Sequence, residues 1–502
     1  MKLSKKIAAG VLAGLMAATL LTGCGNKNNT VDTKNNTATQ APETTGNASG
    51  GNDSTATGDI TKPESIDWMV HSGMNAENGV DQWADEYTRL TGIDMNIEVV
   101  SNNEYAQILE LAFASGDVPD VFDLNGSNLA IYAKQSAVAD LTDLIKNSEF
   151  YDRVDPAIWE SITVDGKIYG VPFEIPSGAV SYVRKDWLDR LGMEIPKTYE
   201  EFTTMLTRFK NEIPECKVPL TAPGLKASMN LPEFFQGANP NFSKVDGKWV
   251  DGMSQDNMIS ALQRLQDSYK AGLIDLEVVT NTTSSCRDQW YSGSVGVFNY
   301  WGGIWGQTLT ERLKVNVPDA EVVAIPPIEG AVYEFALPSV ICINGNLSAE
   351  KVAQLFKYFV EYSHDGGEGQ VLFQSGVEGL HWEQDGNNIK ALPTLSNPDE
   401  VFQKAWITPW LPITPLLITD KNSVLDQTVI DSLEVINTYG KQTPVYPVSA
   451  TLTKIQSDLT LIKEEVIAKV VMGDMTVEDG IAKYKEEADM LGVSKVIEEM
   501  NQ

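Results

Sequence analysis

The chain has 502 residues and carries 69 acidic against 38 basic side chains, so its formal net charge at neutral pH is −31. This excess of negative charge argues against partners such as nucleic acid or anionic lipid, and it mildly disfavours an anionic ligand. Four cysteines, widely spaced, support neither a disulfide framework nor a thiol metal site. Beyond the N-terminus, no apolar run reaches the roughly 18 residues of a spanning helix.

The first 23 residues predict a signal peptide that ends at a lipidation site. Lys2, Lys5 and Lys6 form a basic start, residues 7–21 are apolar, and Leu-Thr-Gly stands directly before Cys24. This junction resembles the bacterial lipobox, which implies cleavage before Cys24 and attachment of lipid to that residue. The alternatives are an ordinary signal peptide or a short anchor helix, for which the apolar run is short. We expect a protein anchored by lipid to the extracellular face of the cell membrane.

Residues 24–59 contain Val31 as their only large aliphatic side chain and no aromatic residue. Such a segment cannot bury enough apolar surface to offset the entropy lost on ordering. We therefore predict a disordered tether with a reach of roughly 30–36 Å.

After the tether, strand and helix patterns alternate. Apolar residues at every second position predict a half-buried strand at 93–99, and short apolar runs predict strands at 119–124, 295–298 and 322–325. Helices are predicted from Thr198, which forms a capping-box pattern with Glu201, and from Ser348. The last 45 residues read as two helices separated at Gly473–Thr476. Alternation of this kind is typical of open, doubly wound α/β sheets.

Five segments in order resemble the extracellular solute-binding proteins of ABC importers, family 1, whose members are lipoproteins that bind sugars or oligosaccharides. They contain the motifs SGDVPD and DGKIYGVP, and they cover residues 83–93, 114–121, 165–172, 183–202 and 291–297. The resemblance extends over most of residues 62–390 and to the paired C-terminal helices.

The resemblance implies an α/β fold of two doubly wound lobes joined by hinge strands, periplasmic-binding-protein-like and of type II, with ligand held in the cleft. The expected divisions are an N-lobe of residues 60–176 and 331–400 and a C-lobe of residues 177–330 and 401–502. The chain should cross between lobes near residues 175–180 and again near 330–338. Some relatives carry a calcium loop where this chain has residues 210–219, but the alternating Asp and Asn ligands are missing, so we expect no metal and no cofactor.

Catalysis has little support in the sequence. The three histidines, His71, His364 and His381, lack zinc-ligand spacing, and no nucleophile elbow, phosphate loop or dinucleotide-binding glycine pattern occurs. A glycosidase carboxylate pair cannot be picked out of 69 candidates. We expect a protein that is not an enzyme, with a secreted glycoside hydrolase as a minor alternative.

Aromatic residues near a strand end suggest a sugar-binding platform. Tyr300, Trp301 and Trp305 follow a predicted strand and are interrupted by glycines, and ligands of open α/β sheets bind beyond the strand ends. Flat sugar faces stack on aromatic rings while hydroxyls bond to polar side chains. The competing interpretation is that these rings pack the lobe core. Trp68, at the first strand, reads as core.

Further ligand contacts are predicted where other strands end. Ser72 and Asn75 follow the first strand, Asp123 and Asn125 end another, and Glu174 lies in the hinge region. The remaining candidates lie after the crossover or late in the chain: Tyr182, Arg184, His381, Trp382, and the segment from Trp406 to Trp410. Each has a structural alternative; Arg184 in particular has an Asp nearby to pair with.

We therefore expect a monomeric, lipid-anchored solute-binding protein. It should capture a carbohydrate, in particular an oligosaccharide, and deliver it to the permease subunits of an ABC transporter. A peptide-binding importer component and a receptor that reports to a membrane kinase share the same signature. The sequence alone does not separate these alternatives.

Overall fold

The computed structural model describes residues 60–71, 78–101, 104–173, 178–225, 228–392, 413–422, 425–447 and 449–502. Several predicted positions lie outside this part of the chain: Cys24, Ser72, Asn75, Glu174 and residues 406–410. Everything stated below concerns the described residues, which contain two separate hydrophobic cores, each built around a sheet of its own.

Five strands form the sheet of the first lobe, in the order β2-β1-β3-β12-β4. They are β1 (Ser65–His71), β2 (Asp94–Val100), β3 (Val121–Leu124), β4 (Val171–Pro172) and β12 (Val340–Ile343). β1 is parallel to β2 and β3, and β12 is antiparallel to β3 and β4. Strands β1 to β4 therefore all end at one edge of the sheet, where β12 begins. Polar residues alternate with apolar ones along β2, as the sequence predicts.

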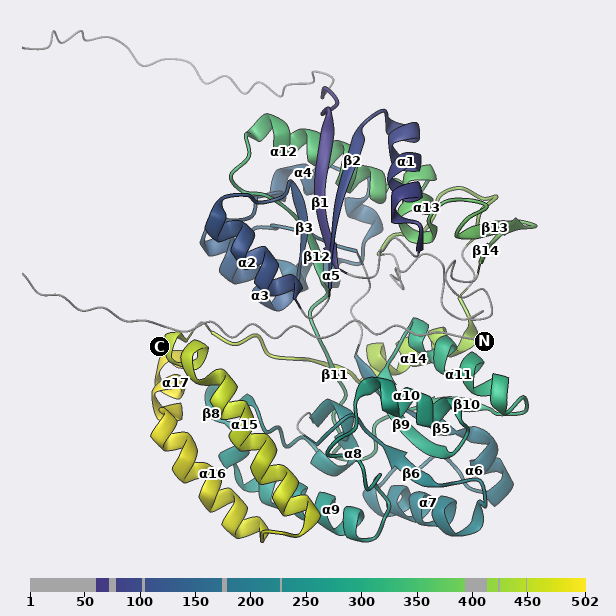
Figure 1. Ribbon diagram of the computed structural model, residues 1–502, viewed down its shortest axis with the longest axis vertical. Helices are drawn as coiled ribbons and strands as arrows, with labels where there is room; N and C mark the ends of the chain where they lie inside the picture. Colours follow the sequence, from purple (N-terminus) through teal and green to yellow (C-terminus); the bar gives the residue numbers. More distant parts are fainter. Residues whose placement is uncertain are drawn as a thin grey trace, which may run out of the picture. The chain divides into compact units, whose positions relative to one another are not determined.

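Helices cover the faces of this sheet (Figure 1). They are α1 (Val80–Thr91), α2 (Tyr105–Ser115), α3 (Gly126–Lys134), α4 (Thr142–Lys146), α5 (Pro156–Ile162), α12 (Ala349–Leu355), the π-helix η5 (Phe356–Glu361) and α13 (Glu368–Ser375). Trp68 is fully buried, with its ring 5.7 Å from that of Trp83 and 5.0 Å from that of Phe359. The prediction that Trp68 belongs to the core is confirmed.

Four strands form the sheet of the second lobe, in the order β10-β5-β9-β6. They are β5 (Ala179–Arg184), β6 (Val218–Thr221), β9 (Val295–Trp301) and β10 (Val322–Ile325). β5 runs antiparallel to both of its neighbours, and β6 is parallel to β9. One edge of this sheet therefore gathers the ends of β6, β9 and β10 together with the start of β5. We call it the Trp301 edge, after the last residue of β9.

The helices of the second lobe follow from local signals that the sequence carries. They are α6 (Lys185–Leu191), α7 (Tyr199–Glu212), α8 (Pro232–Phe235), α9 (Asp256–Lys270), α10 (Thr283–Tyr291), α11 (Ile304–Asn316), α14 (Gln427–Tyr439), α15 (Ala450–Met472), α16 (Val477–Leu491) and α17 (Val493–Met500). Thr198 and Glu201 form the predicted capping box of α7. Gly473 ends α15 with a φ of 88°, and Thr476 caps α16, so the predicted break is confirmed.

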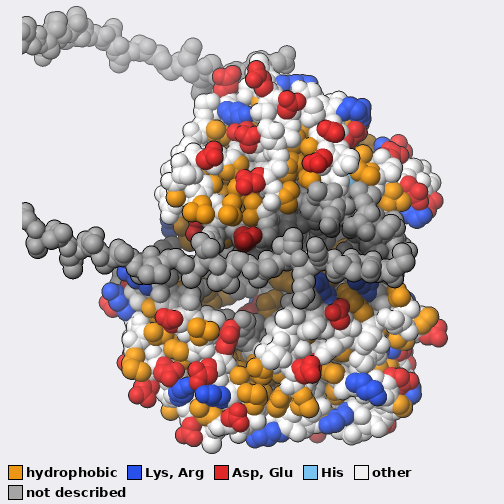
Figure 2. All heavy atoms as spheres, in the orientation of Figure 1, with side chains coloured by type: hydrophobic (Ala, Val, Ile, Leu, Met, Phe, Trp, Pro, Cys, Tyr) orange, Lys and Arg blue, Asp and Glu red, His pale blue; other side chains and the backbone are white. Residues whose placement is uncertain are grey.

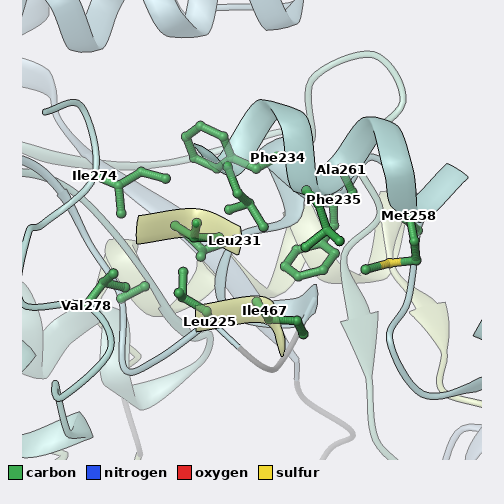
Figure 3. Close-up of a cluster of buried hydrophobic side chains, with 14 of the residues drawn as sticks. Leu225, Leu231, Phe234, Phe235, Met258, Ala261, Ile274, Val278 and Ile467 are labelled. Atoms are coloured by element: carbon green, nitrogen blue, oxygen red, sulfur yellow. The ribbon is translucent and has the colours of Figure 1, made fainter. Parts of the chain in front are cut away.

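Helix α8 is short but is held firmly by apolar contacts. Phe234 and Phe235 are both buried; Phe235 lies near Ala261 and Met258 of α9, and Leu231 lies below α8 (Figure 3). The ring of Phe234 meets those of Tyr199 and Phe202, each at 6.0 Å between centroids. Because large buried rings leave little freedom to the backbone that carries them, this packing also fixes the position of Glu233, which directly precedes Phe234.

Two lobe boundaries differ from the sequence prediction. Ile413 packs in the first core and Gln370 donates a hydrogen bond to the carbonyl of Thr414, so residues 413–422 belong to the first lobe and the boundary expected at 401 is too early. At the return crossing, β11 (Glu334–Phe335) still pairs with β15 (Lys441–Gln442), and Tyr333 packs in the second lobe. That boundary lies between Phe335 and Val340 rather than at residue 330.

Charged side chains are spread over the face drawn in Figure 2, with acidic and basic groups interspersed and no single-sign patch. This distribution agrees with the interpretation of the net charge as a property of the surface as a whole. Among the described helices, none is both long enough and apolar enough to cross a membrane.

Candidate functional site

The Trp301 edge presents one exposed aromatic side chain on a rigid turn. Trp301 retains 38 % of its accessible surface, whereas Tyr300 beside it is buried. The backbone N–H of Gly302 donates to the carbonyl of Gly178 (2.8 Å), and that of Gly303 donates to Ser432 Oγ (2.9 Å). Because both bonds come directly after Trp301, the indole is displayed from a fixed backbone.

The neighbouring rings form a buried stack that ends at a half-buried tryptophan. Phe298 and Tyr300 are 4.9 Å apart between ring centroids, and Tyr300 meets Trp305 edge-on at 5.0 Å. The guanidinium of Arg287 lies 5.2 Å from the ring centre of Trp305. The predicted platform is therefore divided: Trp301 faces outward, Trp305 is half-buried, and Tyr300 packs the core beneath them.

Tyr182 supports this edge from inside the lobe. Its side chain is buried, and its hydroxyl donates to the carbonyl of Trp301 at 2.9 Å. The sequence predicts that Tyr182 contacts ligand, but the structure buries its side chain. Tyr182 instead holds the backbone of the residue that is exposed.

Arg184 lies at the opposite edge of the same sheet. Since β5 is antiparallel to β9, its first residue Ala179 pairs with Trp301, and its last residue Arg184 is furthest from it. The guanidinium is buried, forms a bidentate pair with Asp186 (2.8 and 2.6 Å), and stacks 4.4 Å from the ring of Trp187. Arg184, named from the sequence as a ligand contact after the crossover, is thus buried in the alternative arrangement, a local ion pair with Asp186.

His381 and Trp382 are held by packing and hydrogen bonds within the first lobe. His381 is buried, accepts from the N–H of Val377 at Nδ1 (2.7 Å) and contacts the carbonyl of Asn78 through Nε2 (2.7 Å); burial lowers its pKa. Trp382 begins β13 (Trp382–Asp385), which pairs with β14 (Asn388–Ala391), and its indole N–H donates to the carbonyl of Gly376. Both predicted ligand contacts are instead packing residues of the first lobe.

In the first lobe, Asn125 lies at the edge where the parallel strands end. It is exposed and caps α3, with its side-chain oxygen accepting from the N–H and hydroxyl of Ser127 (3.1 and 2.9 Å). Asp123 lies one step inside β3 and is buried, close to Tyr105 and Cys342, whose pKa values it helps to raise. Of this predicted pair, Asn125 is at the edge and Asp123 faces the interior.

One hollow at the Trp301 edge has no sequence signal. It has a volume of about 300 Å³ and lies beyond the end of β6, the strand next to β9. Pro223 and Gly224 form one wall, Asn281 and Thr282 another, and Glu464 of α15 a third. The side-chain N–H of Asn281 donates to Asp275 at 2.7 Å, a contact that orients the amide. These residues come from distant segments, so no motif could have identified them.

No group of three or more His, Cys, Asp or Glu side chains is placed to hold a metal ion among the described residues. Two other hollows, of about 590 and 450 Å³, lie between α7 and α9 and beside η5, between helices rather than at strand ends.

Comparisons with known proteins agree with this architecture. The family described as bacterial extracellular solute-binding protein matches residues 74–356. Lipoprotein LipO of Bacillus subtilis is 21% identical over 59% of this chain and 62% of its own length. The polygalacturonan/rhamnogalacturonan-binding protein YtcQ of the same organism is 21% identical over 82% of this chain and 86% of its own length.

Among solved structures, the N-glycan transport solute binding protein NgtS from Streptococcus pneumoniae superimposes with a TM-score of 0.64 and 19% sequence identity, covering 88% of this chain and 98% of that one. At this level of identity the likeness establishes the fold, which is that of the periplasmic-binding-protein-like proteins predicted above. The family match extends over more than half of the sequence. The chain therefore belongs to the bacterial extracellular solute-binding protein family.

Proposed function

We propose that this protein is a lipid-anchored receptor that captures a carbohydrate, in particular an oligosaccharide, and delivers it to the permease of an ABC transporter. The observation that carries the proposal is Trp301, an indole exposed at a strand end, with hydrogen bonds holding the backbone directly after it. An aromatic face carried on a fixed backbone suits stacking against a sugar ring, because less ordering entropy is then lost on binding.

The surroundings of Trp301 support an extended ligand rather than a single sugar ring. Trp305, half-buried against Tyr300, follows Trp301 by four residues, and the hollow of about 300 Å³ lies beyond the adjacent strand β6. Amide and carboxylate groups at that hollow, from Asn281 and Glu464, are of the kind that bond to sugar hydroxyls. The printed names of YtcQ and NgtS, which refer to polysaccharide and N-glycan, are compatible with such a ligand.

The binding part of the proposal is tested by calorimetric titration of the full mature protein, solubilised in detergent, against neutral oligosaccharides, uronic-acid oligosaccharides and peptides of matched length. We expect saturable binding of at least one oligosaccharide and none of the peptides. Binding of peptides alone would overturn the carbohydrate assignment.

Delivery to a permease is tested separately, by uptake of a labelled oligosaccharide in cells with and without the gene. We expect uptake to be lost in the deletion strain and restored by the wild-type gene. Unchanged uptake together with an altered transcriptional response to the same sugar would favour a receptor that signals to a membrane kinase.

The anchor is tested by Cys24→Ser, since lipidation requires the cysteine sulfur. Wild-type protein should enter the detergent phase on phase separation, and the variant should stay in the aqueous phase or remain as unprocessed precursor. A variant of mature size that still partitions into detergent would contradict lipid anchoring at Cys24.

A further inference from the structure

A buried polar cluster lies directly inside the Trp301 edge. Glu233 of α8 is fully buried and contacts Ser181 of β5, which in turn contacts Asn299 of β9; both of these residues are also buried. Ser181 and Asn299 are paired across the two strands, two positions from the pair of Ala179 and Trp301 and therefore on the same face of the sheet. The cluster therefore lies beneath the residue that carries the proposed function.

The hydrogen bonds of this cluster form a chain. Asn299 Nδ2 donates to Ser181 Oγ (3.1 Å), and Ser181 Oγ donates to Glu233 Oε1 (2.5 Å). The hydroxyl of Tyr333 accepts from the backbone N–H of Ser181 (3.3 Å) and donates to the carbonyl of Ile325 (3.1 Å). Tyr333 thus joins β5 to β10, and its oxygen lies 3.5 Å from Glu233 Oε1.

Two oxygen atoms of this network are left over. Glu233 Oε2 and Asn299 Oδ1 are both inaccessible to solvent, and neither has a hydrogen-bond partner within the described part of the chain. Both are acceptors when Glu233 is ionised, so neither can satisfy the other. A buried acceptor without a donor is costly, and a single additional proton would supply the missing donor.

Within the part of the chain that the structure describes, no lysine or arginine side chain contacts the Glu233 carboxyl group. From α9, the guanidinium of Arg264 points to the carbonyls of Phe234 and Phe235 (2.6 and 3.0 Å). From α7, the hydroxyl of Tyr199 contacts Ser268. The remaining ionisable neighbours are Tyr333, described above, and the adjacent Glu334, whose carboxyl group interacts with Asn239. A fully buried carboxylate with no positive partner would be strongly destabilising.

We propose that Glu233 is a positioning residue that works as the neutral carboxylic acid, donating its proton to Asn299 Oδ1 and thereby closing the network beneath Trp301. The carboxyl group then has a donor and an acceptor atom, and each leftover oxygen gains a partner. Burial raises the pKa of Glu233, in agreement with this state. Only the consequence for ligand binding rests on the proposed function; the protonation itself does not.

The network lies close to the two segments by which the chain enters and leaves the second lobe, and close to the turn after Trp301. Gly178, where the chain enters the second lobe, forms a β-bridge with Phe335, where it leaves, and also accepts the bond from Gly302. Ser181 and Tyr333 lie close to these two points and are joined by their own hydrogen bond. Loss of the proton would weaken the support of both crossing segments and of the turn after Trp301.

The first test is the free energy of unfolding of the full protein between pH 5 and pH 9, for wild type and Glu233→Gln. The amide of the variant reproduces the proposed donor and acceptor without titrating. Because the folded pKa lies above the unfolded value, the unfolded chain loses its proton first as pH rises, and wild-type stability falls up to the folded pKa. Relative to the variant, the unfolding constant of wild type should rise up to tenfold per pH unit over that window.

The matched control is Glu329→Gln, since Glu329 is exposed. Its unfolding constant should keep a constant ratio to that of wild type at every pH. If Glu233→Gln also shows a constant ratio, or is less stable than wild type throughout, Glu233 is ionised and the proposal is wrong. A wild-type stability that depends on sodium or potassium, compared with choline, would show instead that a cation occupies the cluster.

The second test measures, in the folded protein, the protonation of Glu233 and the protection of the backbone at the Trp301 edge. The infrared difference spectrum between wild type and Glu233→Gln at pH 7 should contain the carbonyl stretch of an un-ionised carboxylic acid. In hydrogen exchange at pH 9, the amides of Ser181 and Gly302 should lose protection in wild type, while Lys185 at the opposite end of β5, bonded to Glu321, keeps it. A carboxylate band, or equal loss at both ends, would overturn the proposal.

Discussion

The two ends of β5 use buried polar groups in opposite ways. At its far end, Arg184 is buried, paired with the partly exposed Asp186 and covered by Trp187, so charge, hydrogen bonds and packing are all satisfied. At its near end, Ser181 belongs to a network with a buried carboxyl group that has no cation and two leftover acceptors, next to the exposed indole of Trp301. The comparison assigns stability to one end of the sheet and places the proposed ligand site at the other.

The largest effect on stability is expected from Trp187→Ala. Trp187 is buried, stacks against Arg184 and meets Phe209 edge-on at 5.3 Å. Truncation leaves a cavity and exposes the guanidinium, so a loss of about 3–5 kcal/mol in the free energy of unfolding is expected. Chemical denaturation measures it. Ligand affinity of the protein that remains folded should be unchanged, and a loss of affinity comparable to that of Trp301→Ala would erase the distinction between the two ends.

A somewhat smaller loss is expected from Arg184→Met. The substitution leaves Asp186 without its partner, but that carboxylate keeps 24% of its side-chain surface. The expected loss is therefore about 2 kcal/mol, below the value for a fully buried pair. The matched control is Arg190→Met, whose pair with Glu215 is largely exposed and should matter by less than about 1 kcal/mol. Equal melting temperatures for the two variants would show that the Arg184 pair does not stabilise this end.

The smallest effect is expected from Tyr182→Phe, which links the two ends. The variant removes only the hydroxyl that donates to the carbonyl of Trp301. Stability should fall by about 1 kcal/mol, the usual value of one hydrogen bond, and the ring keeps its packing. The turn after Trp301 should then exchange its Gly302 amide faster than wild type does. Unchanged exchange at Gly302 would mean that Tyr182 contributes to the core alone.

The local features of the fold were predictable because their signals lie close together in the chain. The capping box of α7, the alternation along β2 and the break at Gly473 each depend on residues within one or two turns. The position of Arg184 was not predictable in this way, because it depends on β5 being antiparallel to β9. A strand's direction is set by its neighbours, and no pattern within residues 179–184 encodes it.

The candidate site shows the same limit. Trp301 was identified because a strand, an aromatic residue and glycines are adjacent in the sequence. Glu233 was not identified, because its partners lie 52 and 100 residues away along the chain. His381 was misjudged for a similar reason: the carbonyl of Asn78 that it contacts is 303 residues distant. Contacts of that range exist only once the lobes have folded.

The most direct test of carbohydrate binding at this edge is the affinity of Trp301→Ala for the tightest-binding oligosaccharide, measured by calorimetric titration together with the melting temperature. Stacking on an aromatic ring is worth about 1–3 kcal/mol, so affinity should fall roughly five- to hundredfold. The melting temperature should stay nearly the same, because the side chain is exposed and the strand beneath it is intact. Leu461→Ala, an exposed apolar residue on α15, should change neither quantity. Unchanged affinity combined with a large fall in melting temperature would contradict the assignment of Trp301 to the ligand and place it in the core.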